Sequence, residues 1–536
     1  GCRCSETRSS PSWQRQPYRG RAKKMAKKAS TALCLIIGCL IVTGLNGAAA
    51  LGIGDSQAPM ISDLPSGHYA EHLQRMQALK AKTPGGDRVP LAAPAATDAV
   101  VSPSAAPAPD RSGSRVYCVT SYGADPTGQT DSTDAVLEAV SGAVNGSGGA
   151  RSLSRGITDL GGARISLGGG VFTISRPLRF PSASIGNLEI YGGTLHASED
   201  FPADGYLIEL TAPSSTNASA PSSSSSYDFE YITLRDLFLD SNYRAGGVSV
   251  VNALRTGIDN CYVARFATAG IHVQGGHETY IRNSFLGQHI TAGGDPGERS
   301  FSGTAIRLMG NDNAVTDVVI FSAAVGVLVA GQANSLSGVH CYNKATGFGG
   351  TGIYLKLPRL TQTRILNCYL DYTGIVAEDP VQLHVSGSFF LGDAFILLKS
   401  VNGVSRGVNI VDNMFSGGGK GVPIVQLDET GGAFTEVDQV VVDRNSVEGM
   451  CLKSTVARGS AAGNGTTWTV DFGHVLLFPD RIRHVQYSVR PERTGVFPSH
   501  VIRNISNNRV VIESNVAVPA TVFVTAEQGT AAAKSI

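Results

Sequence analysis

The stretch Leu366-Asn367-Cys368-Tyr369-Leu370 decides the fold, because versions of it return along the middle of the chain. Each version places a small polar residue before two bulky residues. The spacing between versions is irregular but lies between about 20 and 35 residues, the range in which self-similarity indicates a solenoid or a propeller. The other versions begin at Asp259, Ile281, Gly338, Val385, Val411 and Asp443.

No helical period intervenes between these versions, and turns rich in Gly and Asn separate the short apolar strands. The pattern predicts a parallel β-helix, in which like side chains stack on adjacent coils about 4.8 Å apart. A β-sandwich is the alternative, but it favours two-residue hairpin loops and clean alternation, and neither dominates here. The residues between Gly161 and Met450 would form about eleven coils at about 25 residues each.

Both ends of the repeated region change character. Asp131-Ser132-Thr133-Asp134 precedes the apolar run Ala135 to Val140, which predicts an N-capped helix over about 131–143 that covers the open edge of the first coil. From Cys451 onward apolar and polar residues alternate, which predicts short antiparallel strands. The predicted fold class is therefore all-β: a right-handed parallel β-helix with an N-terminal capping helix and a small C-terminal antiparallel β domain.

The N-terminal residues are expected to lie outside this fold. From Met25 the chain reads Lys27-Lys28, an apolar run from Leu33 to Leu45, and then three alanines ending at Ala50, which is the order of a secretory signal peptide. A membrane anchor is the alternative, but the run is short and contains glycines. We expect a secreted, extracellular protein with these segments: an upstream extension over 1–24, a signal peptide over 25–50, a short helix and Pro/Ala/Ser-rich linker over 51–114, the β-helix over 115–450 and the C-terminal β domain over 451–536.

Composition and charge exclude several classes of protein. Gly accounts for 64 of 536 residues and charged residues for only 16%, without the Gly-X-Y period of collagen or the charge of a coiled coil or a disordered chain. Without residues 1–50 the net charge is −7, so bulk charge attracts the chain neither to nucleic acid nor to an acidic membrane. The five cysteines beyond residue 50 form no C-x-x-C pair. We expect buried thiols with one or two possible bridges, no metal, no cofactor and a monomer.

Several phrases resemble a known family. Ser121-Tyr122-Gly123-Ala124-Asp125 and Gly161-Gly162-Ala163-Arg164-Ile165 are similar to the start of pectate-lyase-like β-helix enzymes, and the runs from His277 to Gly287 and from Tyr342 to Gly350 resemble plant QUARTET-type polygalacturonases. The resemblance covers about 115–530. It implies a secreted glycoside hydrolase that cleaves α-1,4-galacturonosyl bonds of de-esterified pectin in the plant cell wall, including the pollen mother cell wall when microspores separate.

The resemblance also implies motifs that this chain carries only in part. The family's Asn-Thr-Asp reads Ala267-Thr268-Ala269, Gly-Asp-Asp is reduced to Gly294-Asp295, Arg-Ile-Lys reads Tyr354-Leu355-Lys356, and no Gly-His-Gly follows. An inverting hydrolase needs two carboxyl groups about 6.5–9.5 Å apart. We expect Asp295 as the proton donor and Glu298 or Asp312 as the base, although Gly-Gly-Asp-Pro-Gly is also ordinary turn chemistry.

A polygalacturonate chain carries one carboxylate on each sugar, so its binding site needs cations. The repeat count brings six of them to neighbouring coils, and a solvated surface is their alternative role. A Ca²⁺-dependent pectate lyase and a non-catalytic pectin-binding β-helix remain the rival functions. The expected substrate-binding residues are Lys344, Lys356, Arg359, Arg364, Arg282 and Arg299.

Overall fold

A computed structural model describes residues 115–147, 152–154, 156–212, 227–289, 302–342, 350–493, 495 and 497–529. The predicted upstream extension, signal peptide and linker lie outside these ranges. So do four expected site residues, Asp295, Glu298, Arg299 and Lys344. Within the described ranges, no helix is long and apolar enough to cross a membrane.

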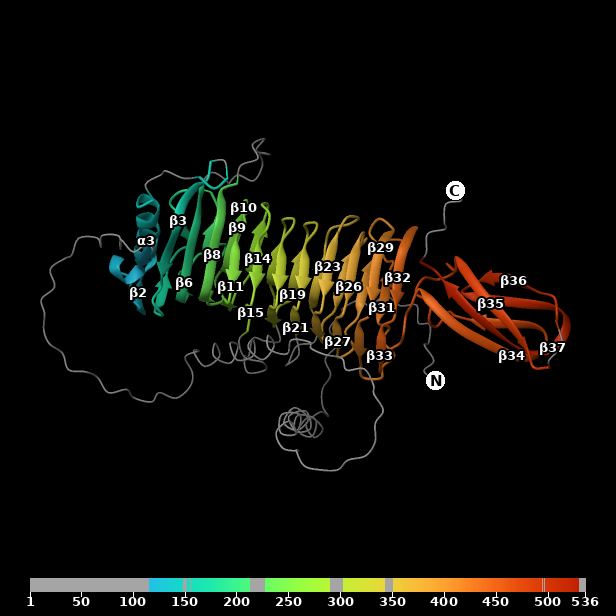
Figure 1. The fold of residues 1–536 in the computed structure, drawn as a ribbon. Coiled ribbons are helices and arrows are strands. Elements are labelled where there is room, and N and C mark those ends of the chain that lie inside the picture. Colours follow the sequence, from blue (N-terminus) through green and yellow to red (C-terminus); the bar gives the residue numbers. More distant parts are fainter. Residues whose placement is uncertain are drawn as a thin grey trace, which may run out of the picture. The chain divides into compact units, whose positions relative to one another are not determined.

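Each turn of the chain passes through three columns of parallel strands (Figure 1). One coil consists of β13 (Ala269–Gln274), β14 (Tyr280–Arg282) and β15 (Phe285–Gly287), and β16 (Thr304–Leu308) then pairs with β13 to begin the next coil. We call the ten-stranded column of β13 and β16 sheet B, the column of β14 ladder 1 and the column of β15 ladder 2. Ladders 1 and 2 join into one 23-stranded sheet because the long strands β6 (Ile185–Ala197) and β8 (Phe229–Asp240) run through both.

The remaining strands follow the same rule. The other strands of sheet B are β5 (Leu178–Arg179), β7 (Tyr206–Leu210), β9 (Gly246–Val251), β19 (Val325–Val329), β22 (Thr351–Leu355), β25 (Ile375–Glu378), β28 (Ile396–Lys399) and β31 (Val425–Asp428). Ladder 1 adds β11 (Gly257–Asp259), β17 (Ala314–Thr316), β20 (Ser335–Ser337), β23 (Thr363–Leu366), β26 (Leu383–Ser386), β29 (Val404–Val411) and β32 (Glu436–Asp443). Ladder 2 adds β12 (Tyr262–Ala264), β18 (Val319–Phe321), β21 (His340–Tyr342), β24 (Tyr369–Asp371), β27 (Phe389–Leu391), β30 (Met414–Ser416) and β33 (Ser446–Glu448). The first coils use β1 (Val116–Cys118), β2 (Thr127–Asp131), β3 (Thr158–Ser166), β4 (Val171–Ile174) and the short β10 (Ala253–Leu254).

The repeated phrase of the sequence is the bend between ladder 1 and ladder 2. One residue at each bend has a left-handed backbone conformation, for example Asn260, Asn283 and Asn367 with φ of 51°, 51° and 53°. Asn, Asp and Gly adopt this conformation at the lowest cost, which explains their recurrence at this place in the phrase. The side chain after the bend points into the coil and is buried, as at Cys261 and Cys368.

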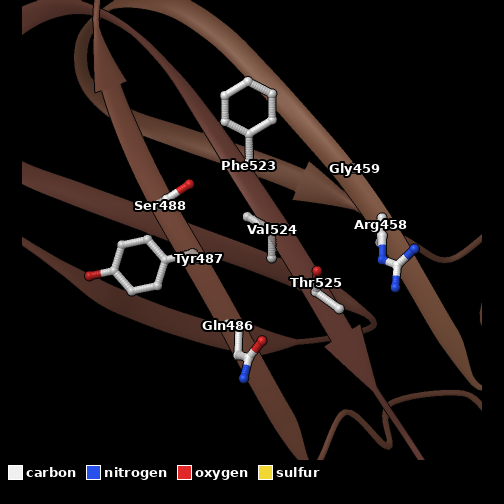
Figure 2. Close-up of a pocket in the computed structure, with 8 residues that line it drawn as sticks. All are labelled: Arg458, Gly459, Gln486, Tyr487, Ser488, Phe523, Val524 and Thr525. Carbon is white, nitrogen blue, oxygen red and sulfur yellow. The ribbon is translucent and has the colours of Figure 1, made fainter.

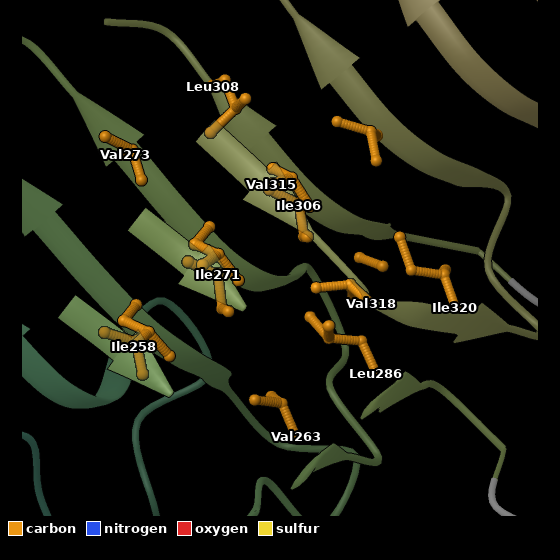
Figure 3. Close-up of a cluster of buried hydrophobic side chains, with 14 of the residues drawn as sticks. Ile258, Val263, Ile271, Val273, Leu286, Ile306, Leu308, Val315, Val318 and Ile320 are labelled. Atoms are coloured by element: carbon orange, nitrogen blue, oxygen red, sulfur yellow. The ribbon is translucent and has the colours of Figure 1, made fainter. Parts of the chain in front are cut away.

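The core lies between the three columns (Figure 3). Ile271 of sheet B, Ile258 of ladder 1 and Val263 of ladder 2 are fully buried, and their partners on the neighbouring coil are also apolar. Each such side chain contributes about 1.5–3 kcal/mol when it leaves water. Stacking of like residues is therefore the main source of stability.

At the N-terminal end, the helix α3 (Thr133–Asn145) packs against β1 and β3, and a short 3-10 helix, η1 (Val119–Tyr122), packs against α3 and β1. The cap of α3 differs from the expected one in detail. Asp131 Oδ1 accepts the Thr133 amide at 3.0 Å, and the Ser132 hydroxyl instead accepts the Asp125 amide at 3.0 Å. The Asp-Ser pair thus joins the helix start to the turn before it.

The C-terminal strands form a separate antiparallel sheet. Its central strand β37 (Arg509–Glu527) pairs with β34 (Val456–Asp471) on one side and with β35 (His484–Pro491) and β36 (His500–Ser506) on the other. Trp468, Ile512 and Val522 belong to its own hydrophobic cluster. The predicted fold class is confirmed in its parallel β-helix, its single α-helix among the described residues and its C-terminal antiparallel sheet, with ten strands in sheet B where about eleven coils were expected.

The five described cysteines are free thiols. Cys118 is exposed, whereas Cys261, Cys341, Cys368 and Cys451 are buried. The bridges that the sequence left open do not form among them.

Candidate active site

The outer face of sheet B carries a row of side chains with chemical function. In its strands one residue points outward between two buried apolar residues, as His272 does between Ile271 and Val273. Strand register places these outward residues side by side, about 4.8 Å from one coil to the next. The row contains, in order, Arg179, Glu209, Ser249, His272, Arg307, Leu328, Tyr354, Val376, Leu397 and Gln426.

His272 and Arg307 form the polar centre of this row. The His272 ring stacks on Tyr206 at a centroid distance of 6.1 Å, and its Nε2 lies 3.2 Å from Gln274 Oε1. Burial lowers the pKa of His272, and the charge of Arg307 lowers it further, whereas the contact with Gln274 raises it. His272 is therefore neutral near pH 7.

Two buried nitrogen atoms at this centre, His272 Nδ1 and Arg307 Nε, have no hydrogen-bond partner among the described residues. A buried polar group without a partner costs about 1–3 kcal/mol, and most buried polar groups in folded proteins avoid that cost.

A second outward row begins two residues later on the strands. Its members Glu378, Lys399 and Asp428 are register partners on β25, β28 and β31, and Lys356 follows directly after β22. Glu378 is only 6% exposed. Its Oε1 accepts the Tyr354 hydroxyl at 2.6 Å and Lys399 Nζ at 3.2 Å.

This second row is a charged cluster with fixed geometry. Burial raises the pKa of Tyr354, and the hydrogen bond to Glu378 together with the charge of that carboxylate raises it further. Tyr354 is therefore a hydroxyl donor and not a phenolate. The face thus combines cations, a fixed carboxylate, a neutral imidazole and a hydroxyl, which are the groups that recognise a polyhydroxylated anion.

Of the three expected catalytic residues, the structure describes Asp312. Residues 290–301, with Asp295 and Glu298, connect β15 to β16 and are outside the described residues. Asp312 lies in the turn after β16, where its Oδ2 is 2.9 Å from His277 Nδ1. The 290–301 segment joins the start of the strand that bears Arg307, and Asp312 follows its end.

Four of the six expected substrate-binding cations are described, and they are divided between two faces. Lys356 and Arg359 are exposed in the turn after β22, at the edge of sheet B. Arg282 and Arg364 are exposed on ladder 1, where Arg282 Nη2 lies 3.3 Å from Asp259. The structure therefore brings Lys356 to the candidate site and sets Arg282 and Arg364 on a neighbouring face.

Arg307, Glu378 and Lys399 were missed at the sequence level. The signal for Arg307 is a second phrase, a small residue followed by an apolar residue, a variable residue and another apolar residue, as in Gly270-Ile271-His272-Val273 and Ala305-Ile306-Arg307-Leu308, and Glu378 and Lys399 stand two residues after the variable position of their strands. The variable position points outward in each strand. Among the described residues there is no group of three His, Cys, Asp or Glu side chains that could hold a metal ion.

Comparison with known proteins identifies the family. No protein-family model matches the chain. Among solved structures, ORF18 of Geobacillus virus E2 is similar with a TM-score of 0.46 at 12% identity over 75% of this chain and 78% of the other. The tailspike protein gp49 of Pseudomonas phage LKA1 is similar with a TM-score of 0.43 at 12% identity over 69% and 68%.

A curated relative is far more similar in sequence. Polygalacturonase QRT3 of Arabidopsis thaliana is 64% identical over 474 residues, which are 88% of this chain and 95% of the relative. The aligned region extends over most of both proteins. The chain therefore belongs to the family of polygalacturonase QRT3.

Proposed function

We propose that this protein is a secreted hydrolase that cleaves α-1,4-galacturonosyl bonds of de-esterified pectin on the outer face of sheet B. The observation that carries the proposal is the outward row of sheet B in which His272 and Arg307 are neighbours, together with Lys356 and Lys399 in the second row of the same sheet. The high identity to a protein named polygalacturonase supports it. The expected setting is the plant cell wall, including microspore separation.

In the proposed mechanism Asp295 donates a proton to the leaving oxygen, and a second carboxylate activates water from the opposite side of the sugar ring. Glu298 and Asp312 are the candidates for this base. Arg307 and Lys356 pair with the carboxylates of neighbouring sugars, and neutral His272 contributes a hydrogen bond without repelling Arg307. Tyr354 and Glu378 hold Lys399 in place at the next coil.

The decisive assay incubates the purified protein with de-esterified polygalacturonate and follows reducing ends together with ultraviolet absorbance. We expect reducing ends to rise without the absorbance of an unsaturated sugar, and we expect chelators to have no effect. Unsaturated, chelator-sensitive products would establish a pectate lyase instead. Binding without any product would establish a pectin-binding protein.

Two variants then assign the carboxylates. Asp295→Asn should retain substrate binding and lose most turnover, because an amide of similar size cannot deliver the proton. Asp312→Asn and Glu298→Gln distinguish the two candidate bases. Normal turnover in Asp295→Asn would show that the acid lies elsewhere.

A further inference from the structure

The exposed face of the C-terminal antiparallel sheet carries a hollow of about 380 Å³ (Figure 2). The side chains around it come from three adjacent strands: Arg458 from β34, Phe523 and Thr525 from β37, and Gln486 and Ser488 from β35. This hollow is on a different sheet from His272 and Arg307. The proposed hydrolysis leaves it without a role.

Strand alternation explains why an aromatic ring is exposed here. On β37, Val522 and Val524 are buried in the cluster of this sheet, so Phe523 between them points outward with 41% of its surface exposed. Its register partners are Ser460 on one side and Ser488 on the other. A ring surrounded by hydroxyl and amide groups offers both an apolar surface and hydrogen bonds.

Two arginines stand on either side of this ring. The Arg490 guanidinium lies over the Phe523 ring at 5.3 Å from its centroid, and Arg458 is the register partner of Thr525 on the opposite strand. No carboxylate lies within ion-pair distance of Arg458 or Arg490 among the described residues, whereas Arg503 pairs with Glu513 at 3.1 Å. Two acids are nearest along these strands, Glu527 two positions beyond Thr525 and Glu492 two positions beyond Arg490, and neither forms an ion pair with Arg458 or Arg490.

We propose that this face, formed by Arg458, Gln486, Ser488, Arg490, Phe523 and Thr525, binds an acidic polysaccharide through its uronate groups. The exposed ring packs against the apolar C–H face of a sugar, and each guanidinium pairs with a carboxylate in a bidentate geometry. Gln486, Ser488 and Thr525 exchange hydrogen bonds with sugar hydroxyls. The charge of the face thus complements the ligand.

The spacing favours a polymer over a single sugar. Arg458 and Arg490 are separated by two strand spacings and by the four residues from Thr525 to Thr521, their register partners. Sheet geometry converts this into a diagonal of about 17 Å. The Arg490 guanidinium reaches back over Phe523, but the two arginines still start from opposite edges of the face, and this favours an extended chain with one carboxylate on each sugar over a single uronate. This inference rests on the proposed function in one respect, that the polysaccharide is the pectin which sheet B cleaves.

Binding at a second surface would hold the enzyme on its substrate. A second contact on the same polymer raises the effective concentration of further bonds near sheet B, without any change in the chemistry at His272 and Arg307. Loss of the face should therefore reduce adsorption to long or insoluble pectate. It should not affect the hydrolysis of short oligomers.

The test compares the full-length protein with Phe523→Ala and with the double variant Arg458→Ala/Arg490→Ala in co-sedimentation with a de-esterified pectate gel. We expect at least tenfold weaker adsorption for both variants, and a weaker salt dependence for the double variant, because it has lost two ionic contacts. Phe497→Ala and Arg503→Ala are the matched controls. Phe497 is 93% exposed and Arg503 is paired with Glu513, and neither belongs to the face. Both controls should adsorb like the wild type.

Two further measurements separate the possible results. Thermal melting shows whether each variant is folded, and kcat/KM on a short galacturonate oligomer should stay within twofold of wild type. Wild-type adsorption by folded Phe523→Ala, or equal adsorption of the wild-type protein to a neutral glucan gel, would overturn the inference. If the wild type releases no product but folded Phe523→Ala still loses adsorption, the proposed hydrolysis fails and the binding face stands.

Discussion

Arg307 is a charged side chain in the middle of a strand whose two neighbours, Ile306 and Leu308, are fully buried. A strand of a parallel β-helix can place such a residue only on its outer surface, because the inner surface is packed with apolar groups. Its partners across the strands are His272 and Leu328, and neither is an acid. The arginine is therefore available for an anionic ligand.

Replacing Arg307 with Ala should raise KM for polygalacturonate about tenfold, which corresponds to about 1.4 kcal/mol of lost binding free energy. The effect should shrink at high salt, because the lost contact is ionic. Initial rates over a range of substrate and salt concentrations measure both quantities. Arg444→Ala is the control, since Arg444 is exposed and pairs with Asp412 at 2.9 Å. An unchanged KM in Arg307→Ala would remove sheet B as the binding surface.

His272, on the same face, makes the stability of the protein depend on pH. Because its pKa is lower in the folded protein than in an unfolded chain, the unfolded state binds more protons as the pH falls below about 6.5. The contribution of His272 to stability is thus fully present above that pH and is lost as the pH falls through its folded pKa. Melting temperatures from pH 7.5 to 4.5 should fall more steeply for the wild type than for His272→Gln. Parallel curves would contradict this expectation.

At the scale of elements, the bend between ladder 1 and ladder 2 was the best-predicted feature. Its phrase is recognisable because a left-handed residue restricts the choice mainly to Asn, Asp and Gly, as at Asn260, Asn367 and Gly387. The site was less predictable. The position of Arg307 depends on which of three columns its strand joins, and local composition does not determine that. For the same reason the four described cations of the expected six, similar in sequence context, divide between the edge of sheet B and ladder 1.

The bend can be tested at Asn367, whose φ is 53°. Asn367→Ala should cost about 1–2 kcal/mol of unfolding free energy, because a Cβ without a local hydrogen-bonding group disfavours the left-handed region. Asn367→Gly should cost less, since glycine has no such penalty. Urea titration of both variants, with Ser337→Ala in an extended strand as control, measures the difference. Equal costs for Ala and Gly would mean that the bend conformation does not limit stability.

At the scale of the whole molecule, the described residues contain two hydrophobic clusters with no shared members, one that fills the coils and also includes Leu477 and Phe478, and one within the C-terminal sheet. The change from repeated bends to clean alternation near Cys451 predicted two kinds of β structure, and the parallel and antiparallel pairings bear this out. The family resemblance is likewise confirmed by the 64% identity to polygalacturonase QRT3.

A substitution in one hydrophobic cluster should shift the unfolding transition of that cluster and not of the other. Ile306→Ala and Ile512→Ala each remove a fully buried side chain and should cost about 2–5 kcal/mol. Ile306→Ala should lower the temperature at which hydrolytic activity is lost. Ile512→Ala should lower the temperature of a separate unfolding transition, that of the C-terminal sheet. Hydrolysis of short oligomers should remain intact in this variant. Calorimetry with a parallel activity assay detects this. A single transition shifted equally by both variants would show that the clusters unfold together.

The reactivity of the buried free cysteines can be used to measure local opening of the coils. Burial raises the pKa of Cys261 and of Cys368 to about 12, so neither thiol ionises while its coil is closed. An alkylating reagent should modify exposed Cys118 at once, and should modify Cys261 and Cys368 only at the rate at which their bends separate. Mass spectrometry of timed samples would then give the rate of local opening at two positions along the β-helix. The natural sequence already contains the probes that such an experiment usually has to introduce.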